Sequence, residues 1–106
     1  MLNSIVAKVA SEANAEVLVY QVPGTKVLAN VSIVIANLGA ASASVRLGKT
    51  TGATLATADL IEAGVSLNAN NGVLRRTNLI MGPNEKLIIQ SPSGDLAVRV
   101  YGLEQQ

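Results

Sequence analysis

LAVRVY, residues 96–101, alternates apolar residues with others, because Leu96, Val98 and Val100 occupy every second position. This is the period-two signature of a β-strand that is buried on one face. Two further apolar runs precede this one, and clusters of Gly, Pro, Asn and Asp separate all three, as in hairpins. We therefore predict three strands over the last third of the chain, at 73–81, 86–91 and 96–102, joined as hairpins by turns at 82–85 and 91–95.

The clearest strand upstream is predicted at 26–37. There Val27, Ala29, Val31, Ile33 and Ile35 alternate with Leu28, Asn30, Ser32 and Val34. The run exceeds the usual strand length of about five or six residues, so we expect it to bend or to lie centrally in a sheet. Residues 43–47 alternate again, and we predict that they pair with 26–37 as a hairpin.

The remaining segments carry weaker signals. Residues 1–10 fit a strand or a short helix, and 16–22 fit a strand. Residues 53–64 fit either a short helix, with Thr57 as its N-cap and Gly64 just past its end, or a short strand around residues 60–61. The strand is favoured in an all-β context. Asn71-Gly72 predicts one more hairpin turn.

About eight strands joined by short turns predict an all-β fold. We expect one domain over residues 1–106, a β-sandwich or a jelly-roll-like barrel of short antiparallel strands. The chain has no Phe, Trp or Cys and only two Tyr, so its core must be built from Val, Ile, Leu and Ala. These side chains bury modest area per residue, so oligomerisation or docking on a partner would add stability.

Composition argues against several functions. The net charge is +1 and only 14% of residues are charged, so we expect no nucleic-acid partner and a surface that is partly covered in use. No apolar run reaches the roughly 18–20 residues of a membrane helix. Lys8 interrupts the N-terminal apolar stretch and Glu12 follows closely, which argues against a signal peptide. We expect no membrane association.

Catalytic side chains are scarce. His and Cys are absent, which removes the commonest general base and the thiol nucleophile, so we predict no enzyme activity, no catalytic residues, no cofactor and no metal. Asp59 and Glu62 lie three residues apart, but a solvated surface pair is favoured over acid–base work. Gly48-Lys49-Thr50 resembles the end of a phosphate-binding loop, yet Ala43 stands where the first Gly is needed, so a hairpin loop is favoured.

Four residues are candidates for an interface: Arg75, Arg76, Arg99 and Tyr101. Adjacent cations in a strand face opposite sides, so one of Arg75 and Arg76 points inward or toward a partner. That arrangement fits an edge strand guarded by an inward charge, which is favoured, or a salt bridge across a subunit contact. Tyr101 could anchor an interface or cap the core.

GVLRRTNLIMGPNEKLIIQS (72–91) and LAVRVYGLE (96–104) together carry a resemblance. The order Gly-Val-Leu-x-Arg-Thr, apolar run, Gly, acidic turn, apolar strand, Ser and a final strand ending Gly-x-Glu resembles small β-rich structural proteins of tailed-bacteriophage particles. The upstream segment 60–62 and the turn at 71–72 also fit it.

The resemblance implies a virion protein, most of all a capsid decoration (cement) protein that binds the outer shell and bridges capsid subunits. Its implied partners are the major capsid protein and further copies of itself, with a trimer favoured. Its implied location is the capsid surface, after synthesis in the host cytoplasm. The alternative is a small structural or receptor-binding protein of the tail, neck or fibre. A hydrolase or lyase is a third hypothesis, disfavoured because the catalytic side chains are scarce.

Overall fold

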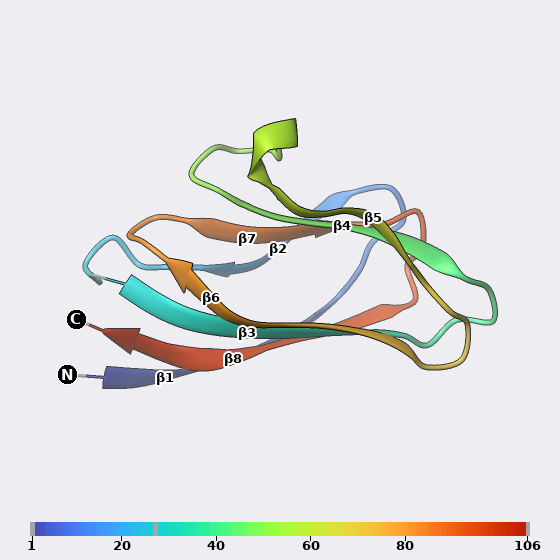
Figure 1. The fold of residues 1–106 in the computed structure, drawn as a ribbon, viewed down its shortest axis with the longest axis horizontal. Coiled ribbons are helices and arrows are strands. Elements are labelled where there is room, and N and C mark those ends of the chain that lie inside the picture. The colour runs from blue at the N-terminus through green and yellow to red at the C-terminus, as the bar shows by residue number, and fades with distance from the viewer. Residues whose placement is uncertain (1, 27, 106) are drawn as a thin grey trace.

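The computed structural model describes residues 2–26 and 28–105, and it is built almost entirely of strands (Figure 1). Its elements are β1 (Leu2–Ala10), β2 (Glu16–Gln21), β3 (Leu28–Asn37), β4 (Ala43–Thr50), a 3-10 turn η1 (Thr57–Asp59), β5 (Leu60–Leu67), β6 (Gly72–Met81), β7 (Lys86–Gln90) and β8 (Leu96–Gln105). The predicted all-β fold of eight strands is confirmed. Val27, the first residue of the predicted alternation, lies outside the described residues.

The strands form two layers of four (Figure 1). We call β1-β8-β3-β6 the first sheet and β2-β7-β4-β5 the second sheet. All pairings between the strands are antiparallel, and they are nested along the chain: β4 with β5, β3 with β6, β2 with β7 and β1 with β8. The chain is thus one long hairpin rolled over itself, closed by the additional pairs β3–β8 and β4–β7. This is the jelly-roll arrangement, one of the two architectures predicted.

The predicted hairpins are wrong, because the short turns join strands of different sheets. The turns at 82–85 and 91–95 carry the chain from β6 to β7 and from β7 to β8, which lie in opposite layers. The link from β3 to β4 and the turn before β6 do the same, so residues 26–37 do not pair with 43–47. Among the described strands only β4 and β5 are consecutive and paired.

The physical reason lies in the hydrogen bonds of the turns. Asn71 of the β5–β6 turn donates its backbone N–H to the carbonyl of Asn37 at 2.7 Å, and Asn70 donates to Gly39 at 3.0 Å. The β5–β6 turn is thus bonded to the last residue of β3 and to the link that follows β3, at the end of the sandwich. Gly and Asn suit such arches as well as they suit hairpins, since both need positive φ; Asn70 and Asn71 have φ of 58° and 87°.

Inward-facing side chains of both sheets form one aliphatic core. The alternation predicted for β3 and β8 is confirmed, with one face of each strand buried, and β3 is central in its sheet as expected. The largest fully buried side chains are Ile33, Ile35, Leu47, Met81, Leu87, Ile89 and Leu96. β1 is a strand, which settles the choice left open for residues 1–10.

The ambiguous stretch holds both predicted elements in sequence. The favoured strand is confirmed as β5, and the short turn η1 precedes it. Ala56, not Thr57, is the N-cap residue, and its N–H is bonded to the Asp59 carboxylate at 2.8 Å. Gly64 lies inside β5, not beyond a helix.

The segment 51–59 folds back over the outer face of the second sheet (Figure 1). Leu55 is buried there, and its N–H is bonded to both carboxylate oxygens of Glu16 at 3.2 and 3.3 Å. Gly48 lies within β4, and a Cβ there would come 2.7 Å from the Asp59 carbonyl oxygen. The Gly48-Lys49-Thr50 triplet is therefore strand and not loop, and its glycine makes room for the covering segment.

Candidate functional site

The outer face of the first sheet, which points away from the second sheet, gathers the exposed apolar side chains. Seven large apolar side chains are exposed over the part of the chain that is described, and six lie on or beside this face. The six are Val6, Leu38, Val73, Ile80, Tyr101 and Leu103. The seventh, Leu18, lies on β2. A concentration of exposed apolar side chains on one face is typical of an interaction surface.

The two outer faces of the sandwich differ in cover. The second sheet is overlaid by segment 51–59, which buries Leu55 and is held by the bond from Lys86 Nζ to the Gly52 carbonyl at 3.2 Å. Ile88 is only 3% exposed beneath this cover. No described segment lies over the first sheet in the same way, as Figure 1 shows for the layer of β6, β3, β8 and β1.

Three cations cross the bare face in one row. Lys8 of β1 is the register partner of Arg99 of β8, Arg99 is the partner of Val34, and Val34 is the partner of Arg75 on β6. The seven Asp and Glu side chains all belong to described residues, and none of them occupies an outward position of these four strands; Asp95 borders the face in the turn before β8. The face therefore combines apolar area with positive charge.

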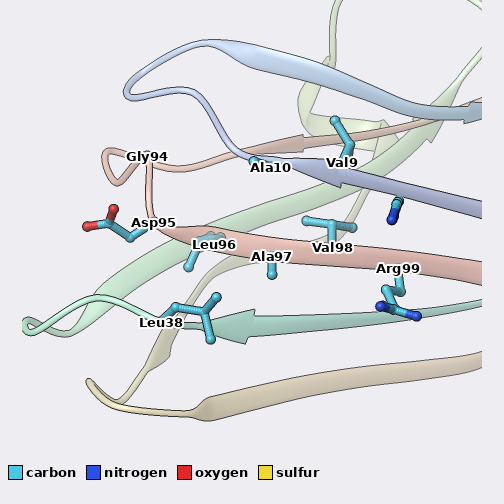
Figure 2. A pocket seen from close by; sticks show the side chains of 10 residues that line it. Val9, Ala10, Leu38, Gly94, Asp95, Leu96, Ala97, Val98 and Arg99 are labelled. Atoms are coloured by element: carbon cyan, nitrogen blue, oxygen red, sulfur yellow. The ribbon is translucent and has the colours of Figure 1, made fainter.

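Two hollows lie side by side on this face and share the side chains of Lys8 and Arg99. One, of about 520 Å³, has Ala10 and Ala97 in it and reaches Leu38. The other, of about 330 Å³, includes Val6 and Tyr101. Figure 2 shows Ala97 and Arg99 on one side of β8 and Val98 on the opposite side.

Three of the four predicted interface residues meet on this face. Arg99 and Tyr101 point outward from β8, and Arg75 points outward from β6. Arg76 points inward and is ion-paired with Glu62 of β5. The prediction that Arg75 and Arg76 face opposite sides is confirmed, and β6 is an edge strand with an inward charge, the favoured interpretation.

Sequence reasoning missed the part of the face that β1 supplies. Lys8 and Val6 belong to residues 1–10, for which the sequence fits a strand or a short helix, yet they lie beside Arg99 and Tyr101 in the sheet. The alternation of Leu96 to Tyr101 was the available signal, because it shows which residues of β8 face outward. It carries no information on which strands flank β8.

The predicted carboxylate pair is engaged in structural bonds. The Asp59 carboxylate accepts the Ala56 N–H, and the Glu62 carboxylate meets Arg76. Within residues 2–26 and 28–105, no group of three or more His, Cys, Asp or Glu side chains is placed to hold a metal ion. Over the same residues, no helix has the length and apolarity to span a bilayer.

The fold and this surface define a small jelly-roll domain with one covered sheet face and one bare, apolar and basic face. No known protein family matches the chain, and no curated protein is significantly similar to it.

Proposed function

We propose that this chain is a structural protein of a tailed-bacteriophage particle, a capsid decoration protein that lays the outer face of its first sheet on the shell. The observation that carries the proposal is the concentration of six exposed large apolar side chains on or beside the one sheet face that no described segment covers. The jelly roll is a fold used in viral capsids, among other roles, so it supports the proposal without deciding it. The sequence resemblance to phage structural proteins points the same way.

The mechanism is mechanical. A face that combines exposed apolar side chains with a row of cations provides a docking surface for the major capsid protein at the contact between neighbouring shell subunits. Each copy contributes a modest contact, and copies joined as oligomers, with a trimer as the favoured state, bind many times more tightly than one copy alone. The shell gains rigidity because each oligomer bridges several subunits.

The first experiment asks where the protein is in the particle. Purified heads and tails of the phage that encodes the chain are separated and analysed by mass spectrometry. We expect the protein in the heads, and heads assembled without it should break at lower temperature and recover when the protein is added back. Recovery in tail or neck fractions alone would favour the alternative role, and absence from all particles would contradict the proposal.

A matched pair of variants tests the face itself. Leu103 on the bare face and Leu18 on the second sheet are 47% and 50% exposed, so the same substitution disturbs folding to a similar small extent. Leu103→Asp should abolish binding to depleted heads, because it places a charge in an apolar contact, whereas Leu18→Asp should bind like the wild type. Equal binding of both variants would show that this face is not the docking surface.

A further inference from the structure

Lys8 and Arg99 are an unfavourable pair in the isolated protein. They are direct register partners across β1 and β8, both on the outer face. Like charges directly opposite each other in an antiparallel sheet destabilise it. Over residues 2–26 and 28–105, the ion pair between Arg76 and Glu62 is the one side-chain ion pair within 4 Å, so no carboxylate offsets the repulsion of these two cations.

A hollow with small side chains adjoins the two cations. Ala10, Ala97 and Ala36 are register partners across three neighbouring strands, so together they make a row without bulk on the outer face. The hollow of about 520 Å³ is lined by Ala10 and Ala97 of this row, and it is bordered by Lys8 and Arg99 on one side and by Leu38 and Asp95 on the other. The hollow therefore has apolar side chains at its base, two cations along one edge and a carboxylate at the opposite edge.

We infer that this hollow receives an acidic–apolar segment of the partner protein, with a carboxylate bridging Lys8 and Arg99 and the adjacent apolar side chain resting on the alanine row. This inference rests on the proposed docking function and names the chemistry that the face recognises. Charge-assisted hydrogen bonds from two cations to one carboxylate are strong and directional. If the segment bound in the opposite direction, its carboxylate would lie beside Asp95 on the far border of the hollow and would be repelled. The segment therefore has one favoured orientation.

A second copy of the same face is a poor occupant. Face-to-face pairing would bring two rows containing Lys8, Arg75 and Arg99 against each other, with no outward carboxylate on the four strands to compensate. Like-charge contacts across an interface strongly disfavour association. The charge pattern therefore favours an acidic partner over self-association through this face.

The direct test compares two charge-matched double variants in binding to heads depleted of the protein. Lys8→Gln/Arg99→Gln should weaken binding by about tenfold to a hundredfold, the range expected when charged hydrogen bonds are lost. Lys26→Gln/Arg46→Gln removes the same net charge from the β2–β3 turn and from β4 of the second sheet, outside the hollow, and should bind within about twofold of the wild type. Wild-type binding should also weaken as salt is raised.

Lys8→Glu adds a measurement on the free protein, its melting temperature, to the measurement of binding to heads. It converts the like-charge pair with Arg99 into an opposite-charge pair, so the free protein should melt at a higher temperature while binding to heads is lost. A gain of stability together with loss of binding cannot come from misfolding. Retained binding, or a melting temperature that does not rise, would contradict the inference.

The results separate the inference from the proposed function. If wild-type protein binds heads and Lys8→Gln/Arg99→Gln binds equally well, the inference fails and the proposed function stands. If wild-type protein does not bind heads, the proposed function fails, and a nuclear magnetic resonance titration with acetyl-glutamyl-leucine amide decides the inference. Shifts at Lys8, Ala97 and Arg99 would then support it; no shifts, or shifts only elsewhere, would overturn it.

Discussion

The guanidinium of Arg76 on β6 is ion-paired with the carboxylate of Glu62 on β5, and the pair links an edge strand of the first sheet to an edge strand of the second. The Glu62 side chain is 15% exposed and that of Arg76 is 44% exposed, so the carboxylate depends more on its partner than the guanidinium does. An inward charge on an edge strand also discourages pairing with a foreign strand.

Removing Arg76 should destabilise the fold modestly. We expect Arg76→Met to lower the free energy of unfolding by about 1 kcal/mol. The substitution leaves a mostly buried carboxylate without its partner, but the loss is limited because water already screens the half-exposed guanidinium. Arg75→Met, the same change on the outer face, should cost less than about 0.5 kcal/mol. Urea denaturation measures both. In Arg76→Met/Glu62→Leu most of the loss should be recovered, and strictly additive effects would argue against the pairing.

Substitutions at Gly64 and Gly102 allow the cost of backbone strain alone to be compared with the cost of strain plus steric overlap. Gly64 in β5 has φ of +115° with no atom within 4 Å of a built Cβ, whereas Gly102 in β8 has φ of +155° and its Cβ would lie 2.0 Å from the Asn30 carbonyl oxygen. We expect Gly64→Ala to cost about 1–2 kcal/mol through strain alone. Gly102→Ala should cost about 3 kcal/mol or more, because β3 must also move. Equal losses in thermal denaturation would contradict the close approach.

Tyr20 should make the protein sensitive to alkali. Burial, and then the hydrogen bond to Glu104 and the charge of that carboxylate, raise the pKa of the Tyr20 phenol above its ordinary value of 10.0. Above about pH 10 the unfolded chain therefore loses a proton that the folded chain keeps, and the free energy of unfolding falls as pH rises. Tyr20→Phe should flatten this dependence in urea denaturation between about pH 9 and pH 11.

Tyr101→Phe is the control for the alkaline prediction, because it removes the other tyrosine and leaves the Tyr20–Glu104 bond in place. In this background the ultraviolet absorbance of phenolate reports Tyr20 alone. Its titration should lie above that of free tyrosine. A steep alkaline loss of stability that persists in Tyr20→Phe would assign the effect to other groups.

Asn37 should be the most sensitive polar residue of the fold. Its side chain is fully buried; it donates to the carbonyls of Ala41 at 2.9 Å and Leu67 at 3.2 Å and accepts the Gly39 N–H at 3.0 Å. Asn37→Ala leaves these buried groups without partners, so we expect a loss of about 2–4 kcal/mol. Asn30→Ala, on the exposed side of the same strand, should cost less than about 0.5 kcal/mol.

Local pattern was sufficient for the strands with clear alternation and for the inward faces of those strands. Alternation along Leu96–Tyr101 identified the outward positions of Arg99 and Tyr101, and adjacency alone placed Arg75 and Arg76 on opposite sides. These inferences hold because the side chains of any strand point alternately to two sides, whatever strands lie next to it. The alternation gives no sign of the role of Asn37, since that role depends on the carbonyl of Leu67 at the end of β5, 30 residues away.

The amino-acid sequence by itself determined an aliphatic, all-β chain of eight strands and the side of each principal strand that is buried. Only the folded chain decided that the turns are arches between sheets, that β1 brings Lys8 beside Arg99, and that segment 51–59 covers one face and leaves the other bare. The physical reason is that periodicity is a local property, whereas strand pairing is a competition among distant partners settled by burial of both sheets together.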